Sequence, residues 1–145
     1  MDKVLIRTLK KEDVEDISSI HAAITQAPVQ NDFKKTIEGH TLREEGASFV
    51  AELNGTVIGY MISYILDGGF GIGKSAWIAM LGVNPKYMGQ GIGDKLAREI
   101  FKYYKRLDII TIYTSVRWDS VDLLSFFKTL GFDRSNFINL RKELK

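Results

Sequence analysis

The stretch "SAWIAMLGVNPKYMGQGIGDKL", residues 75–96, decides the fold. It begins with nine residues that are apolar almost throughout and stop at Asn84-Pro85, as expected of a strand covered on both faces. Apolar residues then recur every four positions from Ile92 to Tyr104, which predicts a helix over residues 92–105. A strand therefore leads through a glycine-rich turn into a helix.

Three glycines alternate with other residues in that turn, at positions 89, 91 and 93. The first backbone N–H groups of a helix lack acceptors inside the helix, and the helix dipole is positive there. Glycine lets the backbone approach phosphate oxygens without interference from a Cβ atom, so several amides can converge on a diphosphate. The alternative is that these glycines serve only to form a tight turn between the strand and the helix. We favour the phosphate site because three alternating glycines follow Asn-Pro.

The rest of the chain supplies further strand and helix patterns. Asn54-Gly55 is a pair that favours positive φ at both turn positions, and it predicts a hairpin. The predicted strands are 4–9, 47–53, 56–66, 75–83, 109–116 (doubly buried) and 136–144 ("NFINLRKEL"), and the predicted helices are 11–24, 32–45, 92–105 and 120–130. This order predicts one α/β domain over residues 1–145, with a mixed sheet that contains a parallel pair joined by a right-handed crossover.

Composition narrows the class of protein. The chain has 145 residues and no apolar run near the about 20 that span a bilayer. It has no cysteine, which excludes a disulfide, a thiolate metal site and a cysteine nucleophile. The net charge of +2 comes from dispersed Lys and Arg, which argues against a nucleic-acid partner. No His or carboxylate cluster has metal-ligand spacing, and the N-terminus lacks a signal-peptide pattern, so we expect a cytoplasmic protein without a metal.

Two other phosphate motifs compete with the glycine turn. A dinucleotide fingerprint needs G-x-G-x-x-G, but the spacing here is G-x-G-x-G, and Asp108 precedes its strand rather than closing it. The P-loop pattern is satisfied literally by "GGFGIGKS", residues 68–75. A P-loop must run into a long helix, whereas the following segment has no polar helical face and is stopped by Pro85. A nucleotide hydrolase is therefore the remote alternative, and we expect Gly68–Lys74 to form a mobile connection between strands.

Two motifs resemble those of a known family. "LGVNPKYMGQGIGDKL", from Leu81, resembles the acetyl-CoA binding motif of the GNAT superfamily of N-acetyltransferases, usually V-x-P-x-x-R/Q-x-x-G-x-G/A-x-x-L. "SVDLLSFFKTLGF", from Ser120, resembles the second motif of the family, and the element order agrees over essentially the whole chain. The resemblance implies a mixed, mostly antiparallel sheet with a splayed central parallel pair and about four flanking helices. It also implies transfer of an acetyl group from acetyl-CoA to a primary amine, directly within a ternary complex.

The resemblance also implies roles for individual residues. The Leu81 N–H should polarise the thioester carbonyl, and the strand end at Leu81–Val83 should pair with the pantetheine arm, which acts as an added strand. The pyrophosphate loop should bind through main-chain amides. The implied cofactor-binding residues are Leu81, Gly82, Val83, Met88, Gly89, Gln90, Gly91, Ile92, Gly93, Asp94, Ser120, Leu123, Phe126 and Phe127.

Several positions depart from the family pattern. Met88 stands where Arg or Gln is usual, and Ser120 and Leu123 replace the usual Asn and Ala. Phe127 occupies the position of the Tyr that many relatives use to protonate the departing thiolate, and a phenyl ring has no proton to donate. Asp94 would repel a diphosphate if it pointed inward, so we expect its side chain to face away.

The general base is also left open, because positions that carry a carboxylate in relatives hold Ala79, Met80 and Ser115. An amine must lose a proton before it attacks, so we predict a route to a side chain or to a bound water. Its candidate partners are Tyr60, Tyr64, Tyr113 and Ser115, and of these Tyr113 and Ser115 join the Leu81 N–H in the predicted catalytic set. The alternative is a non-catalytic acetyl-CoA sensor or interaction module. The acceptor is unidentified, and the sequence leaves a homodimer open.

Overall fold

The computed structural model describes residues 3–43, 47–68 and 71–145. Its contacts divide the chain into two compact units, Met1–Ser115 and Val116–Lys145. The first unit holds the sheet and three helices, and the second holds one helix and the C-terminal segment. The single domain over residues 1–145 stays a prediction.

The first unit is built on a five-stranded sheet in the order β1-β2-β3-β4-β5. Neighbouring strands are antiparallel except β4 and β5, which are parallel, as the sequence predicts for a mixed sheet. The strands are β1 (Leu5–Thr8), β2 (Ser48–Leu53), β3 (Thr56–Gly68), β4 (Gly73–Val83) and β5 (Ile112–Thr114). The hairpin between β2 and β3 turns at Asn54 and Gly55, with φ of 51° and 82°, which confirms the predicted turn.

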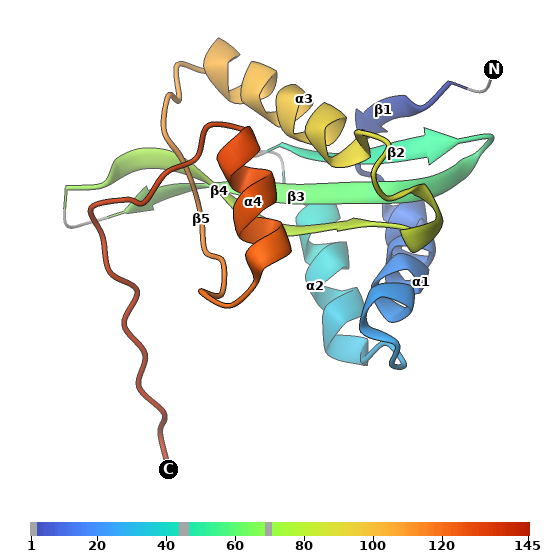
Figure 1. Cartoon of the computed structure of the whole chain (residues 1–145), viewed down its shortest axis with the longest axis horizontal. Helices are drawn as coiled ribbons and strands as arrows, with labels where there is room; N and C mark the ends of the chain where they lie inside the picture. Colours follow the sequence, from blue (N-terminus) through green and yellow to red (C-terminus); the bar gives the residue numbers. More distant parts are fainter. Residues whose placement is uncertain (1–2, 44–46, 69–70) are drawn as a thin grey trace. The chain divides into compact units, whose positions relative to one another are not determined.

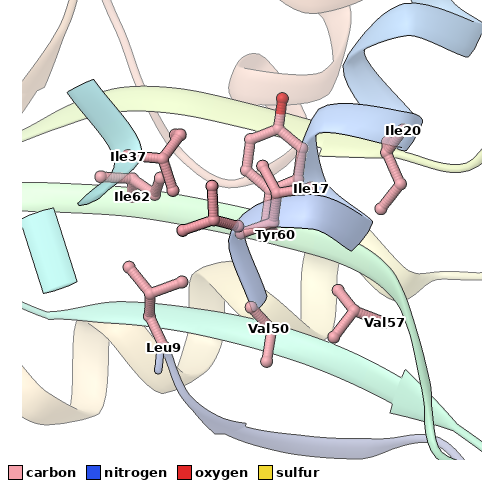
Figure 2. Close-up of a cluster of buried hydrophobic side chains, with 9 residues drawn as sticks. Leu9, Ile17, Ile20, Ile37, Val50, Val57, Tyr60 and Ile62 are labelled. Atoms are coloured by element: carbon pink, nitrogen blue, oxygen red, sulfur yellow. The ribbon is translucent and has the colours of Figure 1, made fainter. Parts of the chain in front are cut away.

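Helices cover both faces of this sheet (Figure 1). Two of them, α1 (Val14–Thr25) and α2 (Asn31–Thr41), lie on one face, and α3 (Ile92–Arg106) lies on the other. Short 3-10 turns precede α1 and α3, at Lys11–Asp13 and Pro85–Tyr87. The α1 and α2 face is closed by a cluster of apolar side chains, shown in Figure 2. The members are Leu9, Val14, Ile17, Ile20, Ile37, Val50, Val57, Tyr60 and Ile62.

The α3 face depends on a buried polar contact as well as on apolar packing. Tyr104, near the end of α3, is fully buried, and its hydroxyl accepts a hydrogen bond from the Ala47 N–H at 2.9 Å. The same oxygen lies 2.7 Å from the Ser63 hydroxyl, which also donates to the Ala47 carbonyl. The chain entering β2 is thereby held to α3 across the sheet.

Removing the Tyr104 hydroxyl should destabilise the protein. Tyr104→Phe leaves the buried Ala47 N–H without its acceptor, so we expect the free energy of unfolding to fall by about 1–3 kcal/mol. Urea denaturation measures this change. Tyr60→Phe is the matched control, because Tyr60 is equally buried but its hydroxyl makes no hydrogen bond within the described residues. Equal losses for the two variants would contradict the role given to the Tyr104 contact.

Two predicted strands differ from the structure. β5 comprises only Ile112–Thr114 instead of residues 109–116, and its residues are half-buried rather than doubly covered. The terminal strand predicted over 136–144 is wrong for this chain, because that segment has no regular secondary structure and its side chains are exposed. A strand forms only where a neighbour shares its backbone hydrogen bonds, and β4 pairs with β5 only from Ala76 to Ile78, while residues 136–144 join no strand of the described sheet.

The remaining differences are smaller. The helix predicted over 32–45 is α2, which ends at Thr41, and residues 44–45 lie outside the described part of the chain. The connection predicted over Gly68–Lys74 is a turn between paired strands, because Gly68 lies opposite Gly73 at the ends of β3 and β4. Residues 69–70 of that segment are outside the described residues. Lys74 and Ser75 are in β4 rather than at a helix N-terminus, so this segment does not have the geometry of a P-loop.

Candidate functional site

The parallel pair separates halfway along β4. β5 pairs with β4 only from Ala76 to Ile78, whereas β4 continues to Val83. The separation coincides with a β-bulge, because Ile62 pairs with Met80 and Ser63 pairs with Ile78, which leaves Ala79 as the extra residue. A bulge bends its strand and can end pairing on one side. From Ala79 onward, the described sheet therefore has an open edge on β4.

Backbone groups of β4 point out of the sheet at this open edge. The Asn84 N–H donates to the Ile58 carbonyl at 2.8 Å. Residues of an antiparallel ladder alternate between bonding their neighbour and facing away from it, so Gly82 bonds toward β3, while Leu81 and Val83 direct their N–H and C=O groups to the open side. An extended molecule can hydrogen-bond to such an edge as an added strand.

Gly82 is fixed at this position by Tyr60, its partner across β3 and β4. A Cβ on Gly82 would lie 2.7 Å from the Tyr60 ring, closer than real contacts allow. The ring is held in the core, with 2% of the residue exposed, and Figure 2 shows the hydroxyl on the side away from Val50. Burial raises the pKa of Tyr60 to about 12, so the phenol stays neutral at physiological pH.

The segment after β4 forms a second feature, at the start of α3. Gly89 and Gly91 have φ of 80° and 79°, values that favour glycine, and no heavy atom lies within 4 Å of where a Cβ would stand on either. The first backbone bond of α3 runs from the Lys95 N–H to the Gly91 carbonyl at 3.1 Å. The N–H groups of residues 92–94 therefore have no acceptor within the helix, and this helix start is suited to an anion.

Charged side chains near the helix start are partly paired. The Asp94 carboxylate accepts a hydrogen bond from Arg98, one turn along α3, at 2.9 Å. Asp94 thus pairs with a residue of its own helix. Arg98, whose positive charge could have bound a phosphate, is engaged in the same ion pair. Amide groups rather than these side chains are the main attraction for an anion at this point.

An aromatic cluster lies on the sheet where β3, β4 and β5 run together. Tyr64 is opposite Trp77 in the β3–β4 register, and Trp77 stacks on Tyr113 of β5 with ring centroids 4.8 Å apart. His40 of α2 approaches Tyr64, with ring centroids 6.3 Å apart, and the Arg43 guanidinium lies 5.3 Å from the Tyr64 centroid. Of the predicted catalytic residues, Tyr113 joins this cluster, while Ser115 follows β5 and is exposed.

Two nitrogen atoms in this cluster are buried without a hydrogen-bond partner among the described residues, His40 Nδ1 and Trp77 Nε1. Burial, with a smaller contribution from the charge of Arg43, lowers the pKa of His40, so its imidazole is neutral at physiological pH. Buried polar atoms are normally hydrogen-bonded, so a water molecule or a polar group of a ligand is the expected partner of each nitrogen. The sequence patterns identify neither Trp77 nor His40 as a site residue, because only the strand register shows that both lie beside Tyr64.

The other predicted cofactor residues lie in the second unit, on or beside α4 (Val121–Thr129). Phe127 is buried, and its ring makes edge-to-face contacts with Phe126 and Phe132 at centroid distances of 5.2 and 5.1 Å. Ser120 precedes the helix, and its carbonyl accepts from the Leu124 N–H at 3.0 Å. The structure thus groups Leu81–Asp94, Tyr113 and Ser115 in the first unit and groups Ser120, Leu123, Phe126 and Phe127 in the second.

Within residues 3–43, 47–68 and 71–145, no group of three His, Cys, Asp or Glu side chains is placed to hold a metal ion. No helix in the same ranges has the length and apolar composition to cross a membrane.

Comparison with known proteins places this geometry in a family. Residues 14–132 match the model of the acetyltransferase (GNAT) family. Solved structures share the fold over nearly the whole chain. Aminoglycoside N-acetyltransferase AAC(6')-Iy in complex with CoA has a TM-score of 0.83 at 15% identity, with 99% of this chain and 96% of that chain covered.

Two further structures are similar. The aminoglycoside acetyltransferase meta-AAC0020 from an uncultured soil metagenomic sample, in complex with sisomicin, has a TM-score of 0.78 at 18% identity, with 98% and 97% of the two chains covered. Ribosomal-protein-alanine N-acetyltransferase from Brucella melitensis biovar Abortus 2308 has a TM-score of 0.78 at 14% identity, with 99% and 100% covered. The family match over most of the chain, on a fold that these structures share, shows that the chain belongs to the GNAT family of acetyltransferases.

Proposed function

We propose that this acetyl-CoA-dependent enzyme transfers the acetyl group to a primary amine by direct attack in a ternary complex. One observation carries the proposal. The open β4 edge at Leu81 and Val83 continues, through one short turn, into the unpaired amides at the start of α3. The first feature suits an extended arm that hydrogen-bonds like a strand, and the second suits a diphosphate. Coenzyme A carries both groups in one molecule.

Each feature then has a role in the reaction. The residues Met88–Asp94 bind the pyrophosphate, and the Leu81 N–H stabilises the negative charge that develops on the thioester oxygen. The ammonium group of the acceptor first loses a proton to a water held near Tyr113 and Ser115. The amine nitrogen forms a bond to the acetyl carbon, the carbon–sulfur bond breaks, and a second proton leaves the nitrogen. The thiolate of CoA takes its proton from solvent, since Phe127 has none to give.

The aromatic cluster supports a particular kind of acceptor. The indole N–H of Trp77 can only donate, so the group that it meets must carry a lone pair, such as a hydroxyl or ether oxygen. Flat rings beside such donors suit an amine on a hydroxylated carbon frame. Two of the similar structures come from aminoglycoside acetyltransferases, which makes amino sugars the first acceptors to test. We place the activity in the cytoplasm.

Release of CoA thiol, read with a thiol reagent, tests the function directly. The chain has no cysteine, so the protein gives no background signal. We expect sisomicin or another polyamine to increase CoA release well above the slow hydrolysis of acetyl-CoA. An alanine-terminated peptide and a lysine peptide complete the panel.

The second candidate function, a non-catalytic acetyl-CoA sensor, is favoured by Phe127 and would be supported by tight acetyl-CoA binding with no turnover on any amine.

A further inference from the structure

Beside the open edge of β4, the paired residues of β3 and β4 carry a single side chain that can donate a hydrogen bond. Residues 59–62 of β3 lie opposite residues 80–83 of β4, and Tyr60 is the donor among them. The proposed transfer leaves a thiolate at this edge, and Phe127 has no group that could stabilise it. Tyr60 is therefore the side chain of this edge whose position matters for the reaction.

The Tyr60 ring extends from β3 over β4, so that its hydroxyl lies above Gly82. A Cβ on Gly82 would be 2.7 Å from one ring carbon and 2.9 Å from the hydroxyl oxygen, so the polar end of the ring covers this residue. Figure 2 shows the same oxygen on the side away from Val50, a residue of β2. Because β2 and β4 flank β3 on opposite sides, the hydroxyl reaches the strand whose outer edge is open.

The Tyr60 hydroxyl is available as a donor. It has no hydrogen-bond partner in the described part of the chain, and it is not among the fully enclosed atoms that lack one, so a ligand can reach it. Burial raises the pKa of Tyr60 to about 12, which keeps the phenol neutral at physiological pH. An ordinary thiol has a pKa of about 8.5, so this phenol would keep its proton beside a thiolate and hydrogen-bond to it.

The direction of the cofactor in the proposed function determines which of its atoms meets this hydroxyl. The diphosphate lies at the start of α3, beyond Val83, and the thioester carbonyl lies at the Leu81 N–H. In acetyl-CoA the sulfur joins the pantetheine arm to the carbonyl carbon. The sulfur therefore lies on the Val83 side of the carbonyl, beside Gly82, and the hydroxyl above Gly82 faces it.

We propose that the Tyr60 hydroxyl donates a hydrogen bond to the sulfur of CoA as the carbon–sulfur bond breaks. This role rests on the proposed function. The amine nitrogen bonds to the acetyl carbon, the sulfur leaves with the electron pair of the broken bond, and Tyr60 keeps its proton. The thiolate then takes a proton from solvent. The Leu81 N–H and the Tyr60 hydroxyl thus stabilise charge on two atoms of the thioester, first the oxygen and then the sulfur.

Tyr60→Phe tests the proposal, because it removes the hydroxyl and keeps the ring. A hydrogen bond to a charged atom accounts for about 10- to 100-fold in rate, so we expect acetyl transfer in a single turnover to slow by that factor. The affinity for acetyl-CoA should stay nearly unchanged. Tyr104→Phe is the matched control, because Tyr104 is also a buried tyrosine but its hydroxyl bonds to the Ala47 N–H. It should lose stability in urea and keep its transfer rate. An unchanged rate in Tyr60→Phe would overturn the proposal.

Titration of the bound CoA thiol tests the same contact without an acceptor. The pH dependence of its alkylation by iodoacetamide, with the protein in excess, gives the pKa of the thiol, and the chain has no cysteine to interfere. We expect a lower pKa in the wild-type protein than in Tyr60→Phe, with an acid dissociation constant about tenfold larger, because a hydrogen-bond donor favours the thiolate. Equal pKa values in the two CoA complexes would overturn the role of Tyr60 and leave the proposed function standing. A wild-type protein that does not bind CoA would overturn both.

Discussion

Gly91→Ala should weaken the binding of acetyl-CoA about a hundredfold, whereas Gly55→Ala should leave it unchanged. In the proposed site, Gly91 presents its backbone to a diphosphate, and a methyl group there would occupy the space in which no protein atom lies within 4 Å. A hydrogen bond from a backbone amide to a charged oxygen contributes about 1.5–3 kcal/mol, so losing one costs about one to two powers of ten in affinity. Isothermal titration calorimetry with acetyl-CoA measures the dissociation constant.

The pair of glycines makes the experiment decisive, because the two positions have the same local geometry. Gly91 has φ of 79° and Gly55 has φ of 82°, and both have open space where a Cβ would stand. Alanine in this conformation costs about 1 kcal/mol or more at either position, so both variants should lose similar stability in urea. A difference in binding therefore reports on the ligand and not on strain. If the two variants bind acetyl-CoA equally well, the diphosphate is bound elsewhere.

Local patterns explain why much of the fold is predictable from sequence. The strand that ends at Val83, the glycine turn and the helix from Ile92 are each set by residues within a few positions. The hairpin at Asn54-Gly55 is equally local, since its turn needs only two positive φ angles. The element order and the candidate cofactor loop follow from these signals. The core positions of α3 follow too, because helical periodicity marks the buried face.

The features that the sequence does not predict depend on contacts between residues that are distant in the chain. The pattern of residues 109–116 describes a strand, but its formed length is set by how far β4 stays alongside, and the bulge at Ala79 ends that contact. The alternating pattern of residues 136–144 likewise suits a strand but does not say whether another strand lies beside it. The meeting of His40, Tyr64 and Trp77 depends on the register of β3 against β4 and on where α2 ends. Periodicity carries no information on register across a bulge.

Gly82→Ala should lower the free energy of unfolding by about 3 kcal/mol, the upper range for overpacking a well-filled core. The new Cβ would stand 2.7 Å from one ring carbon of Tyr60 and 2.9 Å from its hydroxyl oxygen. The ring has little room to move, because Tyr60 belongs to the buried core cluster and only 2% of the residue is exposed. Gly59→Ala is the matched control on the neighbouring strand. Its Cβ would lie 3.0 Å from the Ile92 side chain, a less severe contact than the 2.7 Å at Gly82, so we expect a smaller loss.

A double-mutant cycle with Tyr60 decides why residue 82 is glycine. Tyr60→Leu removes the ring, so Gly82→Ala should cost little further stability in that background, and the coupling between the two changes should be about 2 kcal/mol. Additive losses in urea denaturation would contradict the clash with Tyr60.

Acetyl-CoA binding by the double variant then separates two requirements at this position. If the double variant recovers both its stability and its affinity for acetyl-CoA, glycine is needed at position 82 only to accommodate the Tyr60 ring. If binding stays weak in a stable protein, the open edge beside Leu81 and Val83 also needs a bare backbone, as expected where an extended cofactor arm lies against the strand.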